Sequence, residues 1–143
     1  MSILVTGAAG FIGMHVCKKL LEEGEQVIGI DCLNSYYPIS LKMDRLAILT
    51  KHKNFIFKKI DITKINELEE LKNIEIEAVL HFAAQAGVRY SITNPHAFGE
   101  SNLVGFLNIL EESRRRQVKH FVYASSSSVY GGNLTMPYSE NES

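Results

Sequence analysis

Residues 3–13 have the sequence ILVTGAAGFIG, and the rest of the chain can be read outward from them. The apolar run 3–6 is typical of a buried parallel strand, and an amphipathic pattern that predicts a helix begins at Phe11. Two glycines, Gly7 and Gly10, lie between the predicted strand and the predicted helix, and a third, Gly13, lies in the first turn of that helix. Glycines allow a sharp turn, a close approach of the backbone to a pyrophosphate, and close packing of helix on strand. The stretch therefore predicts a strand–turn–helix unit whose helix N-terminus, at Phe11 and Ile12, binds a dinucleotide pyrophosphate.

Composition narrows the classes of protein to consider. The chain has 143 residues, 45% of them hydrophobic, which suits one globular domain over residues 1–143. A formal net charge of −1 gives no field that would attract nucleic acid or an anionic membrane. Cys17 and Cys32 lack metal or redox spacing, so no metal is expected, and Cys17 is expected in the core. With no signal peptide or long apolar span, we expect a cytoplasmic protein.

One basic cluster stands out, Arg114–Arg116 with Lys119 and His120. It falls at the end of a predicted helix, where cations complement the helix dipole, and we favour that interpretation over phosphate binding.

A second apolar run, 26–31, ends on Asp31, which stands 18 residues after Gly13. This is where dinucleotide-binding folds place an acid that binds the adenosine ribose. A carboxylate accepts hydrogen bonds from both ribose hydroxyls and repels a 2′-phosphate, which favours NAD over NADP as cofactor. The alternative is a solvated loop aspartate.

The alternation of elements continues to the end of the chain. It predicts strands over 3–6, 26–31, 55–59, 78–82 and 121–124. It predicts helices over 11–23, 39–51, 63–71 and 95–116. Thr63 is expected to cap the third helix. Such alternation predicts the α/β class, with a Rossmann-type doubly wound parallel sheet of strand order 3-2-1-4-5 and a crevice between strands one and four.

Several residues beyond the strand ends could border that crevice. Asp61, followed by Ile62, could accept from an adenine amino group or could equally form a capping turn. Small side chains after the fourth strand leave room for a ligand against the backbone: Phe82 is followed by Ala83 and Ala84. Arg89, in an expected loop, could meet a phosphate or carboxylate or be a surface residue. Asn102, on the inner face of its helix, is either tied to neighbouring backbone or supports the cofactor site.

The fifth strand opens into four serines, 125–128. Hydroxyls at the carboxyl end of a parallel strand lie where open α/β sheets place chemistry, although a polar loop would explain them too.

Three of these stretches together resemble a known family. TGAAGFIG at 6–13, HFAA at 81–84 and SSSSVYG at 125–131 are similar to the extended short-chain dehydrogenase/reductase family of nucleotide-sugar epimerases. Two further stretches, DCLNSYY at 31–37 followed by Leu41-Lys42, and AQAGVRYS at 84–91, resemble UDP-glucuronate 4-epimerases in particular.

The resemblance implies bound NAD, a UDP-sugar substrate, and a reaction in which C4 is oxidised, the 4-keto sugar turns, and C4 is reduced from the other face. It implies a catalytic Ser126 that hydrogen-bonds the reacting oxygen. It also implies substrate contacts from Gln85, Gly87, Arg89, Ser127 and Ser128. Relatives usually form homodimers through helices of this sheet.

The chain departs from the family in one respect. The family's base is the tyrosine of a Tyr-x-x-x-Lys motif, but Tyr123, Tyr130 and Tyr138 are followed at the fourth position by Ser, Leu and Glu. We therefore expect the N-terminal, cofactor-binding portion of an epimerase, inactive alone and truncated before the final strands and the substrate domain. The alternatives are a stand-alone NAD-binding or interaction module, or a fragment of a related epimerase, dehydratase or decarboxylase acting on another nucleotide sugar.

Overall fold

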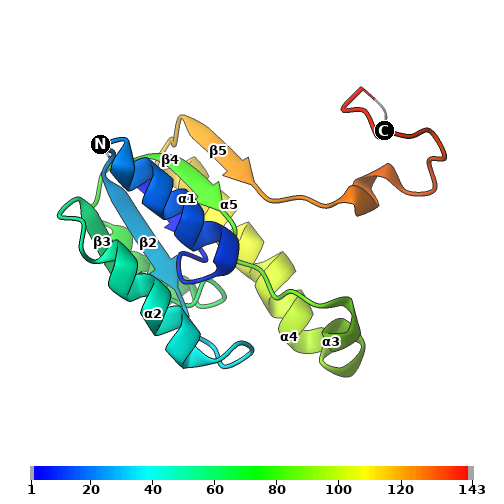
Figure 1. Cartoon of the computed structure of the whole chain (residues 1–143), viewed down its shortest axis with the longest axis horizontal. Helices are drawn as coiled ribbons and strands as arrows, with labels where there is room; N and C mark the ends of the chain where they lie inside the picture. The colour runs from blue at the N-terminus through cyan, green and yellow to red at the C-terminus, as the bar shows by residue number, and fades with distance from the viewer. Residues whose placement is uncertain (1, 142–143) are drawn as a thin grey trace.

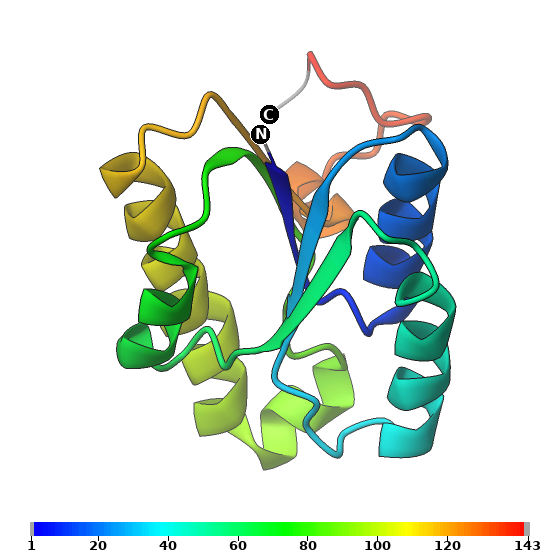
Figure 2. The same ribbon diagram turned by 90° about the vertical axis from the view of Figure 1, so that its left-hand side faces the viewer.

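A computed structural model describes residues 2–141 and shows a parallel five-stranded sheet between two layers of helices (Figures 1 and 2). The strands are β1 (Ser2–Thr6), β2 (Val27–Asp31), β3 (Phe55–Lys59), β4 (Ile76–His81) and β5 (His120–Tyr123). Their order is β3-β2-β1-β4-β5, and every neighbouring pair is parallel. The predicted doubly wound Rossmann-type sheet and its strand order are confirmed.

Two helices, α1 (Phe11–Glu22) and α2 (Ile39–Leu49), cover one face of the sheet, as Figure 2 shows. The other face is covered by the 3-10 helix η1 (Ile65–Leu71) and by α5 (Phe106–Arg115). The remaining elements are α3 (Val88–Thr93), α4 (Pro95–Gly99), the π-helix η2 (Glu100–Gly105) and the short 3-10 helix η3 (Ser127–Tyr130).

The core consists of two apolar clusters, one on each face of the sheet. Neighbouring strand residues point to opposite faces, so Leu4 belongs to one cluster and Val5 to the other. Cys17 is fully buried on α1, as expected, and burial raises the pKa of its thiol to about 12. This cysteine is therefore a packing residue, protonated at neutral pH.

Two segments differ from the sequence prediction. The loop expected around Arg89 is a helix, α3, whose first turn begins after Gly87 and is closed by the bond from Ser91 N–H to the Gly87 carbonyl. The single helix expected over 95–116 is interrupted by the wide turn of η2, so that α4, η2 and α5 follow one another. Such π-turns are often found at functional sites.

The predicted cap at Thr63 is wrong. The 3-10 helix η1 begins at Ile65 after Lys64, and the Thr63 hydroxyl donates to Asp61 Oδ1 at 2.8 Å instead. The Asp61 side chain holds this turn because its carboxylate also accepts from the Thr63 N–H.

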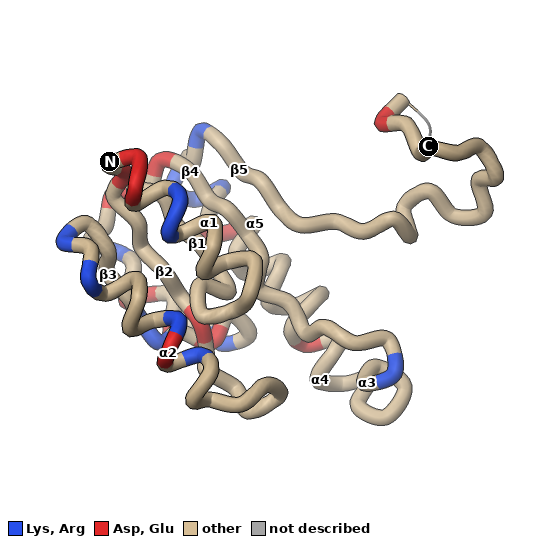
Figure 3. The backbone as a smooth tube through the Cα atoms, viewed as in Figure 1, with Lys and Arg blue, Asp and Glu red and all other residues tan. Residues whose placement is uncertain are grey.

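Charge is distributed over the strands and helices, whereas residues 124–139 carry no charged side chain (Figure 3). The segment after β5 leads away from the sheet (Figure 1). In the basic cluster, Arg114 pairs with Glu111 and Arg116 with Glu112, which supports its interpretation as a helix end rather than a phosphate site. Within residues 2–141, no helix is long and apolar enough to cross a membrane.

Candidate functional site

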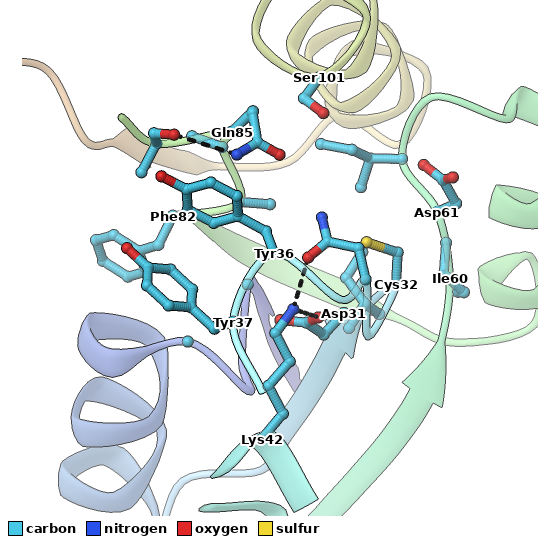
Figure 4. A pocket seen from close by; sticks show the side chains of 18 residues that line it. Asp31, Cys32, Tyr36, Tyr37, Lys42, Ile60, Asp61, Phe82, Gln85 and Ser101 are labelled. Atoms are coloured by element: carbon cyan, nitrogen blue, oxygen red, sulfur yellow. Dashed lines mark hydrogen bonds and ion pairs between the residues drawn. The ribbon is translucent and has the colours of Figure 1, made fainter. Parts of the chain in front are cut away.

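A groove runs along the carboxyl ends of the strands. Figure 4 shows Tyr36 and Tyr37 on one side of it, with Ile60 and Asp61 opposite. The loops after β1, β2, β3 and β4 all contribute to its lining. Of the residues predicted for the site, it brings together Gly7, Gly10, Asp31, Asp61, Ile62, Phe82, Ala83, Ala84 and Gln85. Segments far apart in the sequence therefore meet where the motif analysis expects a dinucleotide.

The glycine loop is tightly folded around the carbonyl of Gly7. Gly7 has φ +70° and its carbonyl accepts from the Gly10 N–H at 2.9 Å. A Cβ on Gly13 would overlap the same carbonyl. Gly10 precedes α1 without any side-chain hydrogen bond to the helix, so the N–H groups of the first turn have no capping side chain. The loop therefore offers an uncapped helix N-terminus of the kind that binds anions.

Asp31 ends β2 with its side chain only 8% exposed, which excludes the solvated-loop alternative. Its Oδ1 accepts from the Leu33 N–H at 2.8 Å and from Lys42 Nζ at 3.3 Å. Its Oδ2 accepts from the Ala9 N–H in the glycine loop at 3.3 Å. Each carboxylate oxygen can accept two hydrogen bonds, so Oδ2 retains capacity for one more donor.

Lys42, on α2, lines the groove although no sequence motif assigned it a role there. Its Nζ also donates to Asn34 Oδ1 at 3.1 Å, and its side chain is as buried as that of Asp31 (Figure 4). The lysine thus neutralises the Asp31 carboxylate. It also joins Asn34, in the loop after β2, to Asp31 at the start of that loop. The sequence did contain a signal for this residue, because Leu41-Lys42 is part of the resemblance to UDP-glucuronate 4-epimerases. A lysine on an amphipathic helix, however, usually lies in solvent.

At the other end of the groove, Thr6 connects β1 to the start of the segment after β4. Its Oγ1 accepts from the N–H groups of Phe82 and Ala83, at 3.1 and 3.0 Å. With both acceptor positions used, the hydroxyl hydrogen is donated to Nδ1 of His81, 2.8 Å away. His81 is therefore neutral, with its proton on Nε2, and burial lowers its pKa to about 4.

Asn102 lies in η2 and holds the backbone of Gln85. Its Oδ1 accepts from the Gln85 N–H at 2.8 Å, and its Nδ2 donates to the Gln85 carbonyl at 3.0 Å. The first alternative considered for Asn102, a tie to neighbouring backbone, is therefore observed, and the Gln85 that it holds lines the groove. The wide turn of η2 presents this amide toward the segment after β4.

A second hollow adjoins the groove and contains Ser126. It shares Phe82, Ala83 and Ala84 with the groove, and its other walls include Asn102 and Phe106. Ser126 precedes η3, and its Oγ accepts from the Ser128 N–H at 3.3 Å. The groove and the hollow together extend from the glycine loop to the serine loop.

Some predicted residues do not line either space. Phe11 and Ile12 start α1 but direct their side chains to its outer face, where they border a shallow apolar hollow. Gly13 is buried behind the glycine loop, and Arg89 is exposed on α3. The other predicted residues outside the two lined spaces are Gly87, Ser127 and Ser128.

Comparison with known proteins agrees with this geometry. The family model described as "NAD dependent epimerase/dehydratase family" matches residues 3–143. Protein CapI of Staphylococcus aureus is 50% identical over 143 residues, which cover 99% of this chain and 42% of that protein. The UDP-glucuronate 4-epimerase of Thermodesulfobacterium geofontis is 47% identical over 139 residues, covering 96% of this chain and 43% of that protein.

Solved structures show the same relationship. The UDP-glucuronic acid 4-epimerase from Bacillus cereus, in complex with UDP-glucuronic acid and NAD, superposes with a TM-score of 0.87 and 35% identity. The match covers 99% of this chain and 45% of that one. The chain thus spans less than half the length of these relatives.

Proposed function

Because the chain belongs to the NAD-dependent epimerase/dehydratase family, we propose that it is the cofactor-binding part of a UDP-glucuronate 4-epimerase. The observation that carries the proposal is the continuous site from the glycine loop to Ser126, formed by residues from all five strand ends. A relative of that activity, 47% identical, supports the choice of substrate.

The residues present fit NAD. Gly7, Gly10 and Gly13 leave no side chain in front of the helix N-terminus, where the pyrophosphate would be held. Asp31 Oδ2 would accept a hydroxyl of the adenosine ribose, and Asp61 with Ile62 would border the adenine. When bound, NAD supplies the oxidant that takes hydrogen from C4 of the sugar and returns it.

The residues at the end of the site away from the glycine loop would contact the sugar and the nicotinamide. Ser126 would donate a hydrogen bond to the reacting oxygen at C4, and Ser127 and Ser128 would contact the sugar. Phe82, Ala83 and Ala84, held by Thr6, would form the wall against which the nicotinamide end lies. Gln85, Gly87 and Arg89 would contact the substrate. That substrate would be a UDP-sugar from the cytoplasm.

No Tyr-x-x-x-Lys motif occurs in the 143 residues, so we propose that this chain alone binds NAD without turning over sugar. The experiment is to express the whole reading frame that contains these residues and to follow UDP-glucuronate by NMR. We expect UDP-galacturonate from the whole polypeptide, with no external NAD consumed. A 4,6-dehydrated or decarboxylated product would contradict the proposed substrate chemistry.

A further inference from the structure

The loop after β2 lines the groove and contacts the segment after β4. Tyr36, in this 32–38 loop, has its ring centroid 4.9 Å from that of Tyr90 on α3, at an interplanar angle of 65°. The Tyr36 hydroxyl also packs on Gly87, where any Cβ would overlap it. Tyr36 is half-buried, whereas the adjacent Tyr37 is 50% exposed.

This contact bridges the site because of the strand order. β1 lies between β2 and β4, so loops after β2 and β4 that touch one another must pass over the loop after β1, which holds Gly7 and Gly10. Tyr36 lines the same groove as these glycines and as Asp31 (Figure 4). A dinucleotide held there would lie beneath the Tyr36 contact.

The two ends of the 32–38 loop are held differently. At its base, Lys42 bonds to Asp31 and Asn34, and the Leu33 N–H bonds to Asp31. At its tip, the ring of Tyr36 lies against Tyr90, with the ring of Tyr37 beside it at 4.7 Å. The base is thus held by an ion pair and hydrogen bonds, whereas the tip is held by aromatic contacts and by the packing of the Tyr36 hydroxyl on Gly87.

Resting on the proposed function, we propose that Tyr36 is a cofactor-retaining residue: its contact with Gly87 and Tyr90 closes the groove over bound NAD and slows its release. An epimerase needs such retention because its cofactor is reduced and then reoxidised within one turnover. Loss of the cofactor between the two steps would strand a 4-keto sugar. Gly87 has φ +99°, a conformation that favours glycine, and its missing Cβ is what lets Tyr36 reach this segment.

The test measures the rate at which the chain releases NADH, a fluorescent probe, after mixing with excess NAD in a stopped-flow instrument. Tyr36→Ala should raise the dissociation rate roughly tenfold, since it removes both the aromatic contact with Tyr90 and the packing on Gly87. Gly87→Ala should raise it at least as much, because its Cβ displaces the Tyr36 ring and because alanine is strained at a φ of +99°. The double variant should release NADH no faster than Gly87→Ala, because both changes break the same contact between Tyr36 and Gly87.

Two matched variants control for general effects. Tyr36→Phe keeps the ring against Tyr90 but removes the hydroxyl that packs on Gly87, so it should release NADH at a rate between those of the unmodified chain and Tyr36→Ala. Tyr138→Ala removes a tyrosine that stacks on Tyr130 and does not line the groove, and should leave the rate unchanged. Thermal unfolding of each variant checks that it is folded.

The outcomes separate the two proposals. If the unmodified chain binds NADH but Tyr36→Ala releases it within twofold of the unmodified rate, the Tyr36 proposal is wrong and the proposed function stands. Multiplicative effects of the two substitutions would also contradict a shared contact. If the unmodified chain binds neither NADH nor NAD, the proposed function fails, and the retention proposal fails with it.

Discussion

Asp31 and Lys42 form a buried ion pair, with Nζ 3.3 Å from Oδ1 and both side chains 8% exposed. The pair lies where the groove would bind the adenosine ribose, and it joins the end of β2 to α2. Its charges compensate one another, so repulsion of a 2′-phosphate by Asp31 is weaker than an isolated carboxylate would give. We therefore expect Lys42 to affect both the stability of the fold and the discrimination between NAD and NADP.

Removal of the lysine should destabilise the chain. Lys42→Met leaves Asp31 buried without its partner, and we expect the free energy of unfolding to fall by about 3 kcal/mol. The double variant with Asp31→Asn should recover part of this loss, because no uncompensated charge remains. Urea unfolding followed by circular dichroism measures both. Lys19→Met, which breaks an exposed pair with Glu23, serves as the control and should change little. Equal effects of the two lysine substitutions would contradict the account.

The Thr6 hydroxyl should be needed for the wall formed by residues 82–84. Thr6→Val keeps the shape but leaves the Ala83 N–H without its acceptor, while the Phe82 N–H keeps only the Thr6 carbonyl at 3.3 Å. An unpaired N–H of this kind costs about 1 to 3 kcal/mol when buried. Thr6→Ser retains the hydroxyl and should unfold close to the unmodified chain in the same urea titration. If valine and serine variants were equally stable, these hydrogen bonds would not matter to the fold.

The packing of the glycine loop can be tested at Gly13. Gly13→Ala places a methyl group against the Gly7 backbone carbonyl, so we expect a loss of about 3 kcal/mol in unfolding free energy. Gly99→Ala is a matched control in a helix, where a Cβ meets nothing within 4 Å, and it should stabilise by about 0.5 to 1 kcal/mol. Thermal melting of the two variants should therefore move in opposite directions.

His81 should make stability fall in mild acid. Burial lowers its folded-state pKa to about 4 from the ordinary value of 6.5, so the unfolded chain takes up the proton first. The contribution is complete above pH 6.5 and is lost as the pH falls toward 4. His81→Asn keeps an acceptor for the Thr6 hydroxyl but cannot be protonated. The difference in unfolding free energy between the two proteins should therefore change between pH 7 and pH 4, and a constant difference would argue against a neutral His81.

Much of the fold could be predicted because its signals are local. The apolar runs, the glycine spacing and the acid at position 31 each indicate an element, and parallel alternation leaves few possible strand orders. The family prediction and the strand order were both confirmed by comparison and structure. Asp31 could be placed because it ends a strand, and strand ends share one edge of the sheet.

The missed features depend on contacts between distant segments. Lys42 is buried in its contacts with Asp31 and Asn34, and its position on an amphipathic helix does not indicate these contacts. Helix α3 depends on the turn at Gly87, where Tyr36 also packs, 51 residues further back in the chain. The π-turn of η2 is not marked by proline, so a continuous amphipathic helix was the simpler prediction there. Such features follow from tertiary packing, which overrides local propensity.

Titration of this chain with NAD and NADP by isothermal calorimetry tests the central claim, that the groove is a dinucleotide site. We predict one NAD per chain and tighter binding of NAD than of NADP. In Asp31→Asn, we predict NAD affinity reduced roughly tenfold, as expected for loss of a charged hydrogen-bond acceptor. No heat of binding with NAD, or an affinity that Asp31→Asn leaves unchanged, would contradict the account.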